Sequence, residues 1–288
     1  MLKVIFLGTS GSAPTIERGM PAIAIKYEGD TFLFDCGEGT QRQMMRFGVG
    51  YGSIDAIFIS HPHVDHYLGL FGLLETLNLS HTQKKLDIYG FKNFAWISEK
   101  YPFVNFHNMK KGQLLKKSEY TISAFPVKHC KGSYALVFQE NEKIKFHEEK
   151  AEAAGIRGRL FREIEEKGFL HINNKKITLE EVSWKKPGRK IVYSGDTLPT
   201  SDMVEIAKNA DLLIHEATFA QDKEKEAAER FHTTIKQAAE IAKKAGVKQL
   251  ALMHFSPRYA NLDQFKDEAR EIFQNTVFAY DGLTIEIK

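Results

Sequence analysis

Short apolar runs rich in β-branched residues recur along the chain and predict strands. A histidine or an acidic residue follows each run within a few positions. The runs are residues 56–59, 121–127, 190–193, 212–214 and 250–253. The residues that follow them are His61 and His63, His129, Asp196, His215 and Glu216, and His254. Because sites in sheet proteins covered by helices form beyond the carboxyl ends of strands, this pattern predicts one shared site.

Capping residues predict helices between these strands. Thr233 and Thr234 can cap a helix over residues 235–245, and Gly246 supplies its end. Ser201 and Asn261 are the predicted caps of two further helices, over residues 201–208 and 261–273.

An early hairpin is also predicted, with strands at 22–27 and 31–35 around a turn at 28–30. Strands followed by helices occur twice, and neither a linker nor a short repeat divides the chain. The pattern favours an α/β fold.

The composition excludes several classes of protein. The chain has 288 residues with 43% hydrophobic and 27% charged residues, which is typical of a globular protein. No apolar run approaches the length of a membrane span, and the short N-terminal run fits a strand better than a secretory signal, so we expect a cytoplasmic location. Cys36 and Cys130 form no CxxC pair, which excludes a disulfide framework and a thiolate zinc finger.

The stretch HPHVDH places His61, His63, Asp65 and His66 within six residues. Imidazole nitrogens and carboxylate oxygens suit zinc and similar divalent ions. Residues two apart in an extended loop face the same way, so His61 and His63 can bind one ion. Asp65 and His66, at the turn into a helix, can reach a second ion. The alternative is a polar loop whose histidines coincide by chance.

Four residues do not complete two metal sites, and His129, Asp196 and His254 are the natural additions because each lies at a strand end. Each of the three taken alone also fits a structural role, such as a turn residue for Asp196. The remaining histidines without such a context, which we interpret as surface or packing residues, are His81, His107, His147 and His171.

These motifs resemble those of the metallo-β-lactamase superfamily and, within it, of ribonuclease Z. HxHxDH indicates the superfamily, and stretches over nearly the whole chain narrow the resemblance. They are FLGTSGSAP (6–14), FDCGEGTQRQ (34–43), PVKH (126–129), GRKIVYSGDT (188–197), HEATF (215–219), HTT (232–234) and HFSPRY (254–259). The chain departs from the commoner pattern at Pro62, Phe71 and Thr233, and residues 155–160 lack the Gly-Pro pair found in the arm of many members.

The resemblance implies a four-layer αβ/βα sandwich formed by a single domain, residues 1–288, with an inserted flexible arm at about 145–186. It also implies two Zn²⁺ ions per subunit, with Mn²⁺ as an alternative ion. One zinc site would consist of His61, His63 and His129, the other of Asp65, His66 and His254, with Asp196 bridging the two.

The implied activity is endonucleolytic removal of the 3′ trailer from precursor tRNA, which leaves a 3′-hydroxyl on the tRNA and a 5′-phosphate on the trailer. His232 is the candidate proton donor to the leaving oxygen, Glu216 would hold its ring, and Asp65 would orient or deprotonate the attacking water. Family members are usually homodimers in which the arm of one subunit serves the site of the other.

Residues 143–190 contain 13 Lys or Arg against 8 Asp or Glu, an excess of +5, whereas the whole chain carries +3. A basic insertion beside a phosphodiesterase site predicts a clamp on an RNA backbone. The alternative is a solvated helix and hairpin with alternating charges.

Two other functions compete with the endoribonuclease. A small-molecule phosphodiesterase or another hydrolase of the superfamily would share HxHxDH without needing the basic arm. A non-catalytic RNA-binding protein with a structural metal fits less well, because structural zinc is normally closed by four ligands.

Overall fold

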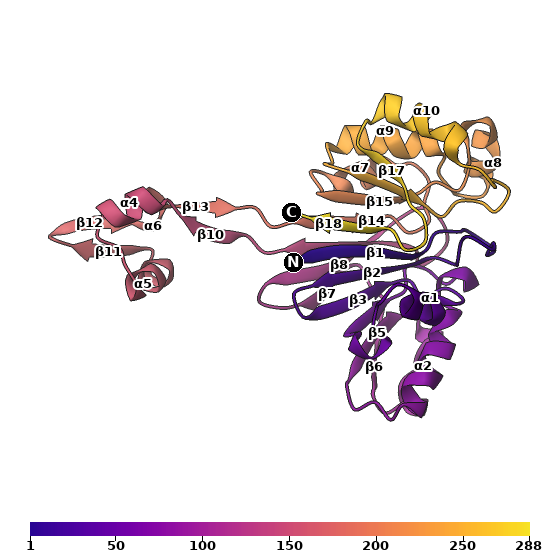
Figure 1. Cartoon of the computed structure of the whole chain (residues 1–288), viewed down its shortest axis with the longest axis horizontal. Coiled ribbons are helices and arrows are strands. Elements are labelled where there is room, and N and C mark those ends of the chain that lie inside the picture. Colours follow the sequence, from indigo (N-terminus) through magenta and orange to yellow (C-terminus); the bar gives the residue numbers. More distant parts are fainter.

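Two seven-stranded sheets pack face to face in the computed structural model, which describes all 288 residues (Figure 1). The first sheet has the order β18-β1-β2-β3-β4-β5-β6. Its strands are β1 Leu2–Gly8, β2 Ala22–Tyr27, β3 Asp30–Phe34, β4 Ala56–Phe58, β5 Leu86–Gly90, β6 Val104–Asn108 and β18 Thr284–Ile287.

The second sheet has the order β17-β16-β15-β14-β9-β8-β7. Its strands are β7 Gly112–Lys116, β8 Tyr120–Pro126, β9 Tyr134–Glu140, β14 Lys190–Tyr193, β15 Leu212–Glu216, β16 Leu250–Met253 and β17 Thr276–Phe278.

The inner faces of the two sheets form the central core, a cluster of 25 buried residues drawn from both. Aromatic rings span the contact: Phe32 of the first sheet lies 5.4 Å from Tyr120 of the second, and Tyr27 lies 5.3 Å from Phe138. Fully burying a side chain of this size stabilises a fold by roughly 1.5–3 kcal/mol, so this contact joins the two halves firmly.

Helices cover the two outer faces and complete four layers. Together with the outer faces of the strands, their apolar sides form one cluster of 22 buried residues on the first sheet and another of 20 on the second. The prediction of a four-layer αβ/βα sandwich is therefore confirmed. The helices are α1 Thr40–Arg46, α2 Gly69–Leu79 and α3 Ile97–Lys100 on the first half, and α7 Ser201–Ala207, α8 Glu224–Glu229, α9 Ile235–Ala245 and α10 Lys266–Ile272 on the second. Short 3-10 turns lie at Tyr51–Ser53, Val64–His66, Lys92–Phe94, Gln221–Lys223 and Asp263–Phe265.

The helix predicted over residues 235–245 is α9, with the predicted bounds. Thr234 and Gln237 form a capping box at its start, and Gly246 ends it with a φ of 63°. A capping box satisfies two backbone donors at once, which explains why the sequence located this helix so well.

Two predicted caps were wrong in detail. Thr200 rather than Ser201 caps α7, because its hydroxyl accepts a hydrogen bond from the Met203 amide at 3.2 Å. Asn261 does accept from the Asp263 amide, but the chain first makes a 3-10 turn there. The α-helix α10 therefore begins only at Lys266.

The predicted strands lie within one or two residues of the observed ones. β14 and β16 have the predicted bounds, and β4 and β8 differ by one residue at their ends. The larger difference is β15, which continues two residues further, to Glu216. His215 and Glu216 are therefore part of the strand rather than residues that follow it.

Strand direction separates two edges of the second sheet. β14, β15 and β16 are parallel, and β9 is antiparallel to both β14 and β8. The carboxyl ends of β8, β14, β15 and β16 consequently share one edge. The end of β9 and the start of β14 share the opposite edge, and the chain between these two strands forms the arm.

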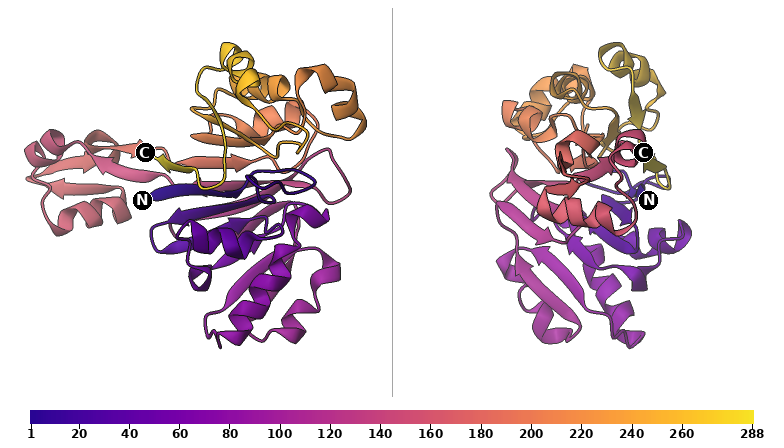
Figure 2. Two further views of the ribbon diagram at one scale, coloured as in Figure 1. Left: turned by 45° about the vertical axis from the view of Figure 1, so that its right-hand side comes forward. Right: turned by 90° about the vertical axis from the view of Figure 1, so that its left-hand side faces the viewer.

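The arm projects from the body on the side where both termini lie (Figures 1 and 2). Strands β10 Lys143–Phe146 and β13 Ser183–Lys186 pair to form its base. A cluster of six buried residues makes a small core further out. The elements of that outer part are α4 Glu148–Ala153, α5 Arg159–Lys167, β11 Phe169–Ile172, β12 Lys175–Thr178 and α6 Leu179–Val182.

None of the helices combines the length and the apolar character needed to cross a lipid bilayer.

Candidate metal centre

The HPHVDH stretch leaves β4 and turns toward the second sheet. His61 and His63 lie on extended chain, and their ring nitrogens Nε2 and Nδ1 are 3.1 Å apart. Asp65 and His66 belong to the 3-10 turn Val64–His66, which directs them to a different point. The local backbone therefore divides the four residues into two pairs, as the spacing predicts.

His129 completes the first group from the end of β8. Its Nε2 lies 3.0 Å from Nδ1 of His63 and 3.7 Å from Oδ2 of Asp196. Nε2 of His61 lies 3.5 Å from the same Asp196 oxygen. Three imidazole nitrogens and one carboxylate oxygen thus face one point.

The second group contains Asp65, His66 and His254, which follows β16. The Nε2 atoms of His66 and His254 are 3.3 Å apart, and each lies 3.6 Å from Oδ2 of Asp65. Oδ2 of Asp196 lies 3.5 Å from the His66 nitrogen and 3.4 Å from that of His254. The same oxygen therefore belongs to both groups.

This arrangement fits a divalent cation better than a set of hydrogen bonds. Ring nitrogens lie only 3.0–3.3 Å apart around a buried carboxylate. The lone pairs of these atoms outnumber the protons that could form hydrogen bonds between them. Oδ1 of Asp196 is buried and has no hydrogen-bond partner. Although burial favours its neutral form, the charges of His254 and His66 lower the pKa of Asp196 well below its usual value. An ionised carboxylate with one oxygen unpartnered and the other, Oδ2, among imidazole nitrogens is a suitable metal ligand.

Asp35 holds the first-sheet side of the centre, a role that the sequence analysis missed. Its Oδ2 accepts from Nδ1 of His66 at 2.7 Å and from the Tyr193 hydroxyl at 2.7 Å. The Ser60 amide donates to Oδ1 of Asp35 at 2.7 Å, and the Ser60 hydroxyl donates to Oδ2 at 2.8 Å. A carboxylate behind a ligating histidine orients the ring and fixes its tautomer.

Other ligands are held in the same way from the second sheet. Nδ1 of His129 lies 2.9 Å from the carbonyl oxygen of Phe231. Nδ1 of His254 lies 2.8 Å from the Thr218 hydroxyl, which donates to Glu216 at 2.6 Å. Each of these second ring nitrogens therefore has a partner, and the Nε2 atoms remain turned toward the centre.

His232 lies beside the centre and is paired with Glu216. Its Nδ1 is 2.9 Å from Oε1 of Glu216 and 4.0 Å from Oδ2 of Asp196. The side chain is 11% exposed. Burial opposes its charged form, but the charge and hydrogen bond of Glu216 outweigh this and raise the pKa of His232 to about 9. Its other nitrogen can therefore present a proton at neutral pH.

The loop after β1 covers the side of the centre formed by Asp65 and His254. Ser12 donates its amide to Oδ2 of Asp65 at 3.0 Å. A side chain at Gly11 would place its first carbon 2.6 Å from the ring of His254, so only glycine fits there. His254 itself has a φ of 60°, a strained value for a residue of this kind, which the surrounding contacts must hold.

The other histidines stay outside the two groups. His107 pairs with Asp87 at 2.8 Å on the first sheet. His215 is fully buried on β15, with its Nδ1 against the Glu216 carbonyl and its Nε2 unpartnered. His81, His147 and His171 are exposed.

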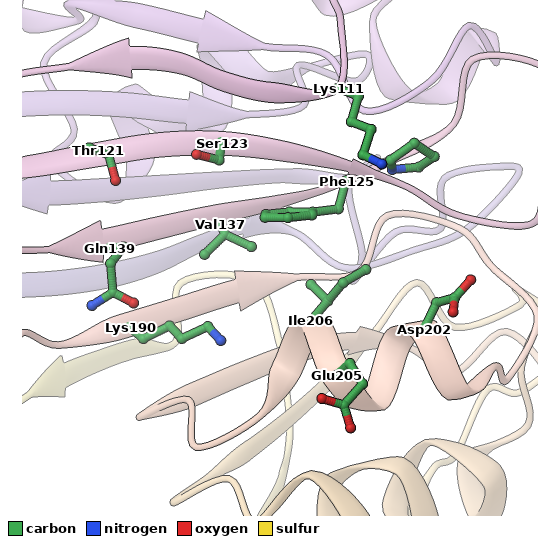
Figure 3. A pocket seen from close by; sticks show the side chains of 11 residues that line it. Lys111, Thr121, Ser123, Phe125, Val137, Gln139, Lys190, Asp202, Glu205 and Ile206 are labelled. Atoms are coloured by element: carbon green, nitrogen blue, oxygen red, sulfur yellow. The ribbon is translucent and has the colours of Figure 1, made fainter.

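A groove of about 680 Å³ lies elsewhere, on the outer face of the second sheet beside α7 (Figure 3). Its charged residues have mixed signs, Lys111 and Lys190 against Asp202 and Glu205, and it has no histidine or cysteine. The groove thus lacks the residues for metal or nucleophilic chemistry, and the ligand cluster remains the candidate centre.

The family model and the similar proteins agree on one family for this chain. The family model described as metallo-beta-lactamase superfamily matches residues 21–234. The ribonuclease Z of Archaeoglobus fulgidus is 40% identical, over 100% of this chain and 98% of the relative. The ribonuclease Z of Myxococcus xanthus is 35% identical, over 100% and 98%.

Solved structures agree with the fold. The short form of human tRNase Z superimposes with a TM-score of 0.69 at 28% identity, over 99% of both chains. The metallo-beta-lactamase fold protein YhfI of Bacillus subtilis gives a TM-score of 0.74 at 21% identity, over 99% of this chain and all of its own.

The contacts of Asp35 generate a prediction about metal binding. We expect Asp35→Asn to weaken divalent-metal binding roughly 10- to 100-fold, because the ring of His66 loses its carboxylate partner. Competition with a coloured chelator measures this affinity directly.

Asp87→Asn is the matched control, since Asp87 also pairs with a histidine but lies away from the centre. Equal metal affinity of the Asp35 variant, the Asp87 variant and the wild type would contradict the role given to Asp35.

Proposed function

Because the chain belongs to the ribonuclease Z family of the metallo-β-lactamase superfamily, we propose that it removes the 3′ trailer from precursor tRNA as a zinc-dependent endoribonuclease. The products are a tRNA with a 3′-hydroxyl and a trailer with a 5′-phosphate. One observation carries the proposal: Oδ2 of Asp196 lies within 3.7 Å of ring nitrogens from both ligand groups, and His232 lies beside them. The proposal includes a cytoplasmic location for the enzyme.

The metal assignment follows the two groups. His61, His63 and His129 would hold one Zn²⁺, Asp65, His66 and His254 would hold the other, and Asp196 would contact both. Mn²⁺ is the alternative ion. When bound, such a pair lowers the pKa of a water and stabilises negative charge on phosphoryl oxygens.

Asp65 orients the attacking water. Burial opposes ionisation of its carboxyl, but the hydrogen bond and charge of His254 lower the pKa of Asp65. A carboxylate that is ionised throughout the neutral range accepts hydrogen bonds reliably. Its Oδ2 already accepts the Ser12 amide, which fixes the direction of the side chain. This low pKa supports orientation of the water more than its deprotonation.

His232 donates a proton to the leaving 3′-oxygen, which departs poorly as an alkoxide. Glu216 keeps this ring charged and directed, because its Oε1 accepts from Nδ1. Glu216 is itself held by the amides of Thr197 and Thr218, at 3.0 and 3.1 Å. The proton donor is thus fixed through a buried carboxylate that cannot turn away.

The active form is a homodimer in which each arm serves the partner's centre. His129, Asp196 and His254 follow the carboxyl ends of β8, β14 and β16, whereas the arm leaves from the opposite edge of the same sheet. Figure 2 shows the arm directed away from the body. An RNA that meets both the centre and an arm therefore needs the arm of a second copy. We propose residues 1–288 as one domain with the arm at about 145–186 as its tRNA-binding insertion.

We expect His232→Ala to reduce precursor-tRNA cleavage by about 10²- to 10⁴-fold, the usual contribution of a general acid. Bound metal should remain at the wild-type level, because Nδ1 of His232 is paired with Glu216 and the seven proposed ligands remain in place. Single-turnover cleavage and elemental analysis measure the two quantities, and near-normal cleavage would exclude His232 as the donor.

The pH dependence of kcat/KM in Glu216→Gln tests the pairing of Glu216 with His232. A raised pKa means that His232 carries its proton below that pKa and loses it as the pH rises through it. Without the carboxylate charge the pKa falls, so the alkaline limb of kcat/KM should move to lower pH. An unmoved alkaline limb would separate Glu216 from the titration of His232.

Deleting the arm should lower cleavage of a large substrate but not turnover of a small one. With residues 145–186 replaced by a short linker, we expect cleavage of precursor tRNA to fall by at least 10-fold, since phosphate contacts dominate nucleic-acid affinity. Turnover of bis(p-nitrophenyl) phosphate should be preserved, because the arm lies away from its own centre. Equal losses on both substrates would make the segment structural.

A further inference from the structure

The positive charge of the arm is concentrated near its base. We call residues 143–145 and 183–190 the stalk, and residues 146–182 the tip. The tip contains seven Lys or Arg against eight Glu, whereas the stalk contains six Lys or Arg and no acid. The whole excess of charge in the insertion therefore lies on the stalk.

The strand register places three of the four lysines in the paired strands on one face. Lys143 pairs directly with Lys186, and Lys145 pairs with Trp184. Directly opposed residues and residues two apart share a face of a sheet, so these four side chains lie together. We call them the stalk face. Ile144 and Lys185 point to the other side, where Lys185 lies 3.7 Å from Glu142.

A buried carboxylate fixes the end of the stalk to the body. Glu140 is 6% exposed in its side chain and binds Arg189 through both oxygens, at 2.6 and 3.0 Å. It also pairs with Lys143 at 2.9 Å and accepts the Tyr27 hydroxyl. Arg189 donates further to the carbonyl of Ile287 at 3.0 Å. The stalk therefore leaves the body in a defined direction.

Glu140 leaves the outer cations unpaired. Neither Lys145 nor Lys186 makes an ion pair, and both are exposed. Together with Lys288 they surround a hollow of about 190 Å³ that has no apolar lining residue. Glu140 is the one acidic side chain among the lining residues, against five cationic ones, so the hollow keeps a positive excess.

Like charges directly opposite on paired strands destabilise a sheet. The Lys143–Lys186 pair is partly offset by Glu140, but Lys145 and Lys288 add further repulsion. Trp184, which is 46% exposed, lies on the same stalk face. Cations with an adjacent aromatic ring are the usual surface for a nucleic-acid backbone.

We propose that the stalk face and the hollow beside it bind the phosphate backbone of the RNA substrate, with Trp184 against a ribose or an unstacked base. The proposal rests on the proposed function. It places the electrostatic contact between the arm and the RNA on the stalk rather than on the tip. Lys145, Lys186 and Lys288 contact phosphates, and Glu140 positions Arg189 and Lys143 behind them. The tip, with its net negative charge, contributes shape rather than charge.

The test is the salt dependence of precursor-tRNA binding, measured in the His232→Ala background to suppress cleavage. The slope of log affinity against log KCl concentration counts phosphate contacts, at about one per lysine. In the double variant Lys145→Gln/Lys186→Gln we expect this slope to fall by about two. Equal melting temperatures before and after substitution show that the fold is intact.

Lys150→Gln/Lys175→Gln is the matched control, because it removes two exposed, unpaired lysines from the tip. Its slope should change by less than one. A lowered slope in this variant with an unchanged slope in the stalk variant would overturn the inference while precursor-tRNA cleavage by the wild type stands. A wild type that neither binds nor cleaves precursor tRNA would overturn the proposed function as well.

A second readout does not depend on the lysine variants. The chain has two tryptophans, so Trp96→Phe leaves Trp184 as the single tryptophan, whose emission is separated from that of the ten tyrosines by selective excitation. Precursor tRNA at saturation should quench its emission, and 1 M KCl should restore it. Emission unaffected by bound RNA would place the RNA away from the stalk face.

Discussion

The shared carboxylate of Asp196 is the interaction on which the centre depends. One of its oxygens lies 3.4–3.7 Å from nitrogens of His61, His66, His129 and His254. These histidines come from both halves of the sandwich, so the halves must stay in fixed register. The aromatic contact between the sheets provides that register, and the centre is as rigid as the core beneath it.

The same geometry separates chemistry from substrate binding. Strand polarity places His129, Asp196 and His254 at one edge of the second sheet, and the arm leaves from the other. In the proposed homodimer, one copy would hold the reactive groups while its arm faces the other copy. A fold can in this way keep one set of site residues while an insertion away from them selects the substrate.

Much of the centre was predictable because its residues are local in sequence or follow strands. HPHVDH needs only an extended chain and a turn to divide into two pairs, and α9 carries its own capping box and glycine stop. Asp35 was not predictable in the same way. It lies 31 residues from His66, and its role arises only from the pairing of β3 with β4. The prediction from Asn261 failed because its side chain accepts from the Asp263 amide at the start of a 3-10 turn rather than of an α-helix.

The charged face of the arm could be predicted only in part from the sequence. A charge count over 143–190 found its basic excess, but cross-strand pairing was needed to see that Lys143, Lys145 and Lys186 share a face.

The most direct test of the account is cleavage of a 3′-extended precursor tRNA by the purified protein, mapped to the nucleotide, with Asp65→Ala beside it. The account predicts one cut just after the discriminator nucleotide, with a 3′-hydroxyl on the tRNA, and no cut by the variant. An uncut precursor together with turnover of bis(p-nitrophenyl) phosphate would contradict it and indicate a small-molecule phosphodiesterase.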